Sequence, residues 1–145
     1  MEYFNPVEII YTNSWLNELI DSQKNLGILN PILVTSPGNR RRLSLDSVFN
    51  PDSIFSDIGE NPNFDDCGNV LTFCKDKNYD GVIALGGGSV MDLAKVVMAF
   101  LSTGKTNIVD LLKFKGHTKG QFHLYFYPQL MALEVKSPCG GRSGI

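Results

Sequence analysis

The stretch YDGVIALGGGSVMDLAKVVMAF, residues 79–100, decides how this chain folds. Its first part, Gly81–Leu85, is a continuous apolar run, which is typical of a strand covered on both faces of a parallel sheet. Residues 86–89, Gly-Gly-Gly-Ser, end that run, and apolar side chains at helical spacing follow over about residues 90–102. A strand, a glycine turn and a helix in this order predict one unit of an α/β fold.

Helices and strands alternate in the preceding part of the chain as well. Ser14 and Gly27 bracket a helix expected over residues 14–26, since serine suits the N-cap and glycine the left-handed position after the last turn. Short connections between alternating strands and helices predict a Rossmann-like parallel sheet with helices on both faces. The other expected elements are a strand at residues 32–34 after Pro31, a turn at 35–39, a short helix permitted within 40–50, a strand at 53–58, and a helix capped by Asp65 with the apolar stripe Cys67, Val70, Leu71 and Cys74.

Composition and charge bound the class of protein. The 145 residues are 43% hydrophobic and carry a net charge of −2, so neither a nucleic acid nor an anionic membrane is expected as a partner. The start of the chain lacks the features of a secretory signal, and no apolar run approaches the length of a membrane helix, which favours a cytoplasmic location. Cys67, Cys74 and Cys139 form no Cys-x-x-Cys pair, which argues against a disulfide framework and a zinc site.

The glycine turn points to a bound phosphate. A turn without Cβ atoms leaves backbone N–H groups uncovered at the positive end of the following helix, and this end lies at the ligand crevice of an open α/β sheet. Ser89 can cap the helix or bond a phosphate oxygen, and Asp92 and Lys95 share one helix face. A tight turn, an ordinary cap and a surface ion pair explain the same residues equally well. The spacing is neither Gly-x-Gly-x-x-Gly nor a Walker A loop.

Residues 86–95, Gly-Gly-Gly-Ser-Val-Met-Asp-Leu-Ala-Lys, resemble the signature Gly-Gly-Gly-Ser-x-x-Asp-x-Ala-Lys of the iron-containing (group III) alcohol dehydrogenases at every position. The segments NPVEIIY, PILVTS and ENPNF resemble the family's opening strand, its first nucleotide-domain strand and the Asn-Pro loop ahead of the helix that precedes the signature. The resemblance extends over roughly residues 5–110.

This resemblance implies the N-terminal domain of a two-domain dehydrogenase, an oxidoreductase that interconverts a small alcohol and its aldehyde by hydride transfer with NAD or NADP. The family's divalent metal, iron or zinc, is held by an Asp and three His of a helical C-terminal domain. We identify none of those ligands here, expect His117 and His123 to be ordinary surface or core residues, and assign no catalytic residue. The cofactor residues that the resemblance implies are Gly86, Gly87, Gly88 and Ser89 at the pyrophosphate, and Asp92 and Lys95 supporting that loop or facing the nicotinamide.

Ser36 bears on the choice between NAD and NADP. Many members of the family carry at this position an Asp that binds the ribose hydroxyls of the adenosine. A carboxylate there would repel a 2′-phosphate, whereas a serine would not. With Arg40, Arg41 and Arg42 close by, the sequence favours tolerance of NADPH, although the three arginines fit a solvated loop equally well.

The last part of the chain departs from the family. The resemblance stops near Gly120, and Pro128 is followed by Gln-Leu-Met-Ala-Leu-Glu-Val-Lys where the family has Pro-Thr-Thr-x-Gly-Thr-Gly-Ser-Glu. Translated back into degenerate codons and read from the last base of each codon, the segment from Tyr127 permits Pro-Thr-Thr-Asn-Gly-Thr-Gly-Ser-Glu-Val-Thr. We therefore hypothesise a one-base shift, in the gene or in its sequencing, at or before Tyr127.

The shift divides the chain into parts. Residues 1–126 are then an incomplete NAD(P)-binding domain and residues 127–145 an out-of-frame tail, and the helical metal domain is absent. Such a fragment is expected to lack activity alone. Two alternatives stay open: a nucleotide- or anion-binding module without redox chemistry, and a non-functional remnant. A homo-oligomer is compatible with each of these interpretations.

Overall fold

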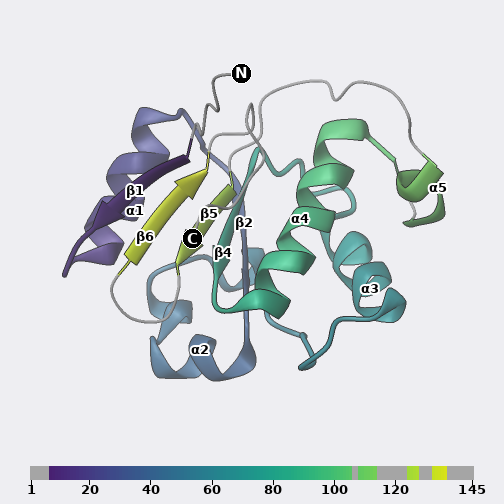
Figure 1. Ribbon diagram of the computed structural model, residues 1–145, viewed down its shortest axis with the longest axis horizontal. Helices are drawn as coiled ribbons and strands as arrows, with labels where there is room; N and C mark the ends of the chain where they lie inside the picture. Colours follow the sequence, from purple (N-terminus) through teal and green to yellow (C-terminus); the bar gives the residue numbers. More distant parts are fainter. Residues whose placement is uncertain (1–6, 106–107, 114–123, 128–131, 137–145) are drawn as a thin grey trace, which may run out of the picture.

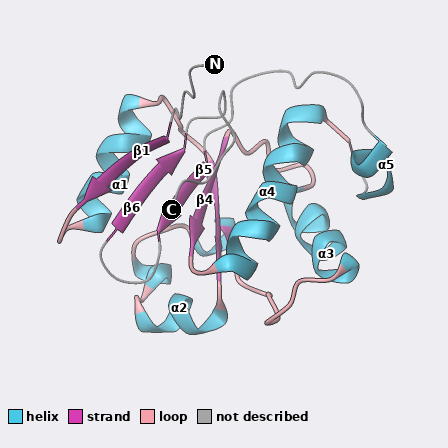
Figure 2. Cartoon of the chain, viewed as in Figure 1, coloured by secondary structure: helices cyan, strands magenta, loops and turns pink. Residues whose placement is uncertain are grey.

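The computed structural model describes residues 7–105, 108–113, 124–127 and 132–136. These residues form a six-stranded sheet with the strand order β1-β6-β5-β4-β2-β3, flanked by helices (Figures 1 and 2). The strands are β1 (Val7–Tyr11), β2 (Pro31–Thr35), β3 (Ile54–Phe55), β4 (Gly81–Leu85), β5 (Leu124–Tyr127) and β6 (Ala132–Lys136). The helices are α1 (Trp15–Asn25), α2 (Pro37–Arg42), α3 (Phe64–Cys74), α4 (Gly88–Thr103) and α5 (Ile108–Lys113), with 3₁₀ turns η1 (Leu45–Ser47) and η2 (Pro51–Ser53).

The centre of the sheet is parallel. β2 pairs with β3 and β4, and β4 pairs with β5, all in the parallel sense. This confirms the predicted α/β class. β6 lies between β5 and β1 and runs antiparallel to both, so the sheet becomes mixed on that side. β6 falls within residues 127–145, and their assignment to an out-of-frame tail stays a prediction.

Two apolar layers hold the helices against opposite faces of the sheet. Because successive side chains of a strand point to opposite faces, neighbouring residues of β2 and β4 enter different layers. One layer joins the sheet to α3 and α4, and the other joins it to α1 and η1, which confirms helices on both faces (Figure 1). The first layer includes Ile32, Val34, Val82 and Ala84 with Val70, Leu93 and Val97, and the second includes Leu33, Ile83 and Leu85 with Leu19 and Leu45.

The beginning of α2 differs from the expected turn at residues 35–39. Pro37 is the first residue of the helix, where its fixed φ fits and its missing N–H costs nothing. Ser36 is the N-cap, and its hydroxyl accepts a hydrogen bond from the Asn39 N–H at 3.2 Å. Serine and proline are common in turns as well as in helix starts, and here the helix start is formed.

The cap of α3 also differs from the expectation. Asn63, not Asp65, is the N-cap, and its side-chain oxygen accepts from the N–H groups of Asp65 (2.8 Å) and Asp66 (3.0 Å). The Asp66 carboxylate accepts in return from the Asn63 N–H at 2.8 Å, which completes a capping box. β3 is shorter than the expected strand at 53–58, whereas α1 with Gly27 at φ 68° and the buried strand β4 are confirmed.

Candidate functional site

A pocket of about 310 Å³ lies where β2, β3 and β4 end. The parallel pairing of these strands puts their carboxyl ends at one edge of the sheet, so the segments that follow them meet there. In sequence order these segments are the start of α2, the loop after β3, and the turn into α4. The pocket is lined by Ser36, Asn39, Ile58, Gly59, Glu60, Gly87, Gly88, Ser89 and Val90.

The first turn of α4 offers backbone donors to this pocket. The first N–H groups of a helix have no partner within the helix, and the helix dipole makes this end positive. The N-cap of α4 is Gly87, which makes no side-chain cap, and no acidic residue lies in the first turn. α3, by contrast, has both a capping box and the carboxylates of Asp65 and Asp66. The chain thus leaves the N-terminus of α4 available for an external anion.

The three glycines differ in what a side chain would meet. A Cβ at Gly86 would lie 2.7 Å from Cγ2 of Val90, so the fold itself excludes a side chain there. Apart from its own chain neighbours and helix backbone, a Cβ at Gly87 or Gly88 would meet no atom of the described residues within 4 Å. Both of these residues line the pocket, so their missing side chains widen it without improving the packing of the chain. This cradle, which a Cβ would partly fill, fits a phosphate that approaches the backbone closely.

Ser89 connects two walls of the pocket. Its hydroxyl donates a hydrogen bond to the carbonyl oxygen of Glu60 at 2.5 Å, which ties the loop after β3 to the first turn of α4. In this arrangement the serine proton is engaged with the loop, and the hydroxyl oxygen keeps its capacity to accept. Ser89 therefore shapes the pocket, and the backbone N–H groups are the donors left for an anion.

A buried polar network joins the ends of β2 and β4. The Leu85 carbonyl accepts from the Thr35 hydroxyl at 2.7 Å and from the Asn39 side-chain amide at 3.3 Å. Thr35 is fully buried and Asn39 is 4% exposed, so these bonds lie away from water and fix the two strand ends relative to each other. Asn39 was not predicted from the sequence, because only the helical start of α2 turns its side chain toward β4.

The structure brings together four of the seven cofactor residues proposed from the sequence. Ser36, Gly87, Gly88 and Ser89 line the pocket, and Gly86 lies behind the turn against Val90. Asp92 and Lys95 do not line it. Their side chains are 68% and 48% exposed and form an ion pair of 3.3 Å on the outside of α4, which is the surface pair that the sequence analysis left open. No sequence pattern indicated Gly59 and Glu60, which reach the pocket through the course of the loop after β3.

The described residues fit the two implied cofactors, a dinucleotide and a metal ion, to different extents. The open cradle and the uncapped N-terminus of α4 fit the pyrophosphate of a dinucleotide. For a metal, the described part of the chain holds no group of three or more His, Cys, Asp or Glu residues arranged to bind one. His117 and His123 lie outside the described residues. In that same described part, none of the helices has the length and apolar character needed to span a membrane.

Comparisons with known proteins agree on one family. The profile of the family described as iron-containing alcohol dehydrogenase matches residues 6–129. A long-chain-alcohol dehydrogenase of Geobacillus thermodenitrificans is 28% identical over 108 residues, which cover 70% of this chain and 27% of that protein. The chain thus spans about a quarter of the length of the curated relatives that it matches.

Solved structures show the same fold. An iron-containing alcohol dehydrogenase of Thermotoga maritima superposes with a TM-score of 0.67 at 23% identity, covering 88% of this chain and 37% of that chain. The sulfoacetaldehyde reductase of Bifidobacterium kashiwanohense in complex with NAD⁺ also gives a TM-score of 0.67, at 19% identity, covering 88% of this chain and 35% of that chain.

Proposed function

The chain belongs to the iron-containing alcohol dehydrogenase family, and on this premise we propose that its pocket binds the pyrophosphate of NAD or NADP. The observation that carries the proposal is the pair Gly87 and Gly88, which line the pocket and whose missing side chains are explained by no packing contact with the described part of the chain. The reductase of known structure that resembles this chain was crystallised with NAD⁺, which supports a dinucleotide as the ligand.

Each wall of the pocket has a separate part in this binding. The N–H groups of Gly88, Ser89 and Val90 begin α4 and would donate to phosphate oxygens, assisted by the helix dipole. Asn39 and Thr35 keep the end of β2 at a fixed distance from the turn through their shared acceptor, the Leu85 carbonyl. The bound nicotinamide would supply the hydride acceptor or donor.

For the whole protein we propose an oxidoreductase that transfers hydride between NAD(P)H and a small alcohol or its aldehyde. The support is the family and its named relatives, which include a long-chain primary alcohol dehydrogenase of Thermoanaerobacter ethanolicus. The described residues offer no ligand set for a metal. We expect the chain to be inactive alone, in the cytoplasm, and able to form a homo-oligomer.

Thermal unfolding of the 145-residue chain with NADH, NADPH or inorganic pyrophosphate, each near 1 mM, tests the proposed binding. We expect the dinucleotides to raise the midpoint, because a ligand at a hundred times its Kd adds about 2.7 kcal/mol to stability. The matched variant Gly88→Val, with its side chain in the cradle, should fold, but neither nucleotide should raise its unfolding midpoint by much. A cooperative wild-type transition that neither nucleotide shifts would refute the proposal. Protection by pyrophosphate equal to that by dinucleotides would support a general anion-binding module instead.

A further inference from the structure

The cluster Arg40, Arg41 and Arg42 ends α2, beside the pocket, but its members have different surroundings. The Arg40 guanidinium forms an ion pair with Asp46 and also donates to the Ser56 hydroxyl at 3.2 Å. The Arg40 hydrogen bonds and charge hold the pKa of the Asp46 carboxyl below its usual range. Arg40 therefore already has an anionic partner within the chain.

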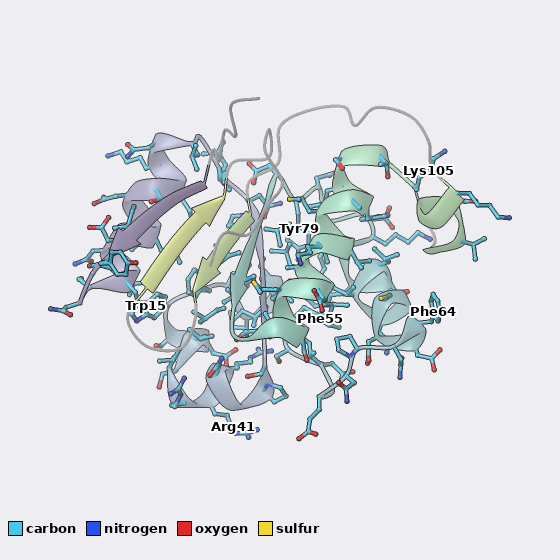
Figure 3. All side chains as sticks on the ribbon, viewed as in Figure 1. Trp15, Arg41, Phe55, Phe64, Tyr79 and Lys105 are labelled. Carbon is cyan, nitrogen blue, oxygen red and sulfur yellow. The ribbon has the colours of Figure 1, made fainter. Side chains whose placement is uncertain are left out.

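The other two arginines point in different directions. Arg41 is exposed and extends from the outer side of α2, away from the sheet (Figure 3). Arg42 instead reaches back along the helix, as helical side chains do, and its Nη2 donates to the Asn39 side-chain oxygen at 2.8 Å. Arg42 is exposed and does not itself line the pocket, but this bond ties its guanidinium to Asn39, a buried residue that does.

No described residue neutralises the charge of Arg42. Among the described residues the guanidinium forms no ion pair with a carboxylate, and most of its donors are left for another acceptor. Ser36, which follows β2 in the same wall, introduces no negative charge. A guanidinium that has no carboxylate partner among the described residues, on the helix that the neutral Ser36 caps, is the chemistry that accommodates a ribose 2′-phosphate.

We infer that Arg42, held by Asn39, binds the 2′-phosphate of the adenosine ribose and makes the pocket prefer NADPH to NADH. This inference rests on the proposed function, since it needs the dinucleotide in the pocket. It assigns the three arginines different roles: Arg40 fixes α2 to Asp46, Arg41 faces solvent, and Arg42 contacts the ligand.

Equilibrium binding of NADPH and NADH to the full chain, by calorimetry or nucleotide fluorescence, tests the assignment. We expect wild type to bind NADPH at least tenfold more tightly, and Arg42→Gln to weaken NADPH binding by about tenfold to a hundredfold while leaving NADH binding unchanged. Arg41→Gln is the matched control, because it removes the same charge from the same helix and should alter neither affinity by more than about twofold. Arg42→Lys should recover part of the preference, since it restores charge without the planar fork.

Several outcomes would overturn the inference. The first is a wild-type preference for NADH, and the second is an equal loss of affinity for NADPH and NADH in Arg42→Gln. The third is a loss of NADPH affinity in Arg41→Gln as large as that in Arg42→Gln. The same comparison can be made without the nicotinamide half by using the fragments adenosine 2′,5′-bisphosphate and 5′-AMP. We expect the ratio of their affinities to equal the ratio for NADPH and NADH. If wild type binds neither dinucleotide, the proposed function fails and this inference fails with it.

Discussion

Three adjacent glycines, Gly86, Gly87 and Gly88, lack side chains for two different physical reasons. Gly86 has φ +157° and is pressed against Val90, so its small size is required by the packing of the turn on α4. Gly87 has φ −91°, which any residue adopts, and Gly88 is helical, so neither backbone conformation requires glycine. At the residue scale, stability and the proposed ligand binding therefore involve different members of one sequence motif.

Gly86→Ala should lower the free energy of unfolding by about 1–3 kcal/mol, because the new Cβ overlaps the Val90 side chain. Gly88→Ala should leave it unchanged or raise it by up to about 1 kcal/mol, since alanine is favoured over glycine in a helix. Urea unfolding of both variants measures the difference. The penalty of Gly86→Ala should shrink in a Val90→Ala background, and a penalty that persists there in full would show that backbone strain, not the overlap, is responsible.

Cys74 gives a prediction for alkaline pH. Burial raises the pKa of its thiol to about 12, whereas the unfolded chain ionises it near 9. Because the folded pKa is the higher one, the contribution is fully present below the unfolded pKa and is lost as pH rises toward the folded value. Between pH 9 and 11 the stability of wild type should fall more steeply than that of Cys74→Ala, by at most about 1.4 kcal/mol per pH unit. Parallel curves would contradict the buried, protonated thiol.

At the scale of elements, segments with a clear apolar pattern were predictable and segments without one were not. α1 and α4 carry apolar side chains at helical spacing, and β2 and β4 are short apolar runs bounded by turn residues. α2 has six residues and three of them are arginines, so its formation depends on the Ser36 cap and on Arg40 reaching Asp46. The cap of α3 was misassigned because Asn63 and Asp65 are both good capping residues, and the choice depends on where the loop turns.

Asn63→Ala should lower the free energy of unfolding by about 1 kcal/mol, because it removes the acceptor for two N–H groups of α3. Asp65→Ala is the control. Its carboxylate only interacts favourably with the helix dipole, which is worth about 0.5 kcal/mol at an exposed site. Chemical denaturation measures the free energy of unfolding of both variants. A larger loss of stability for Asp65→Ala than for Asn63→Ala would show that Asp65 is the N-cap, as expected from sequence alone.

At the scale of the whole molecule, the position of the site follows from the parallel sheet. Ser36 and residues 87–89 are about fifty positions apart, and the pairing Thr35↔Leu85 places them in one pocket. A parallel sheet predicts this meeting from sequence. Asn39 and Glu60 were not predictable in the same way, since their places depend on how α2 starts and how the loop after β3 crosses the turn.

The register of β5 indicates where a segment read in the shifted frame would lie. Leu85 pairs with Tyr127, so the chain leaves β5 beside the place where β4 leads into Gly86. A Pro-Thr-Thr-Asn-Gly-Thr-Gly-Ser-Glu segment read from the shifted frame would start at this point, next to the pocket. Its hydroxyl and N–H groups would then add donors on the side of the pyrophosphate opposite α2.

We therefore expect the coding DNA to spell this segment when it is read one base out of frame from Tyr127, and sequencing it decides the matter. A chain translated in that frame through the segment should bind NADPH and NADH at least tenfold more tightly than one that stops after Tyr127, because two or more phosphate hydrogen bonds are added. The comparison needs both chains to unfold cooperatively. If the codons do not spell the segment, residues 127–145 are native sequence, and β6 then takes its place between β1 and β5 as a true strand of the sheet.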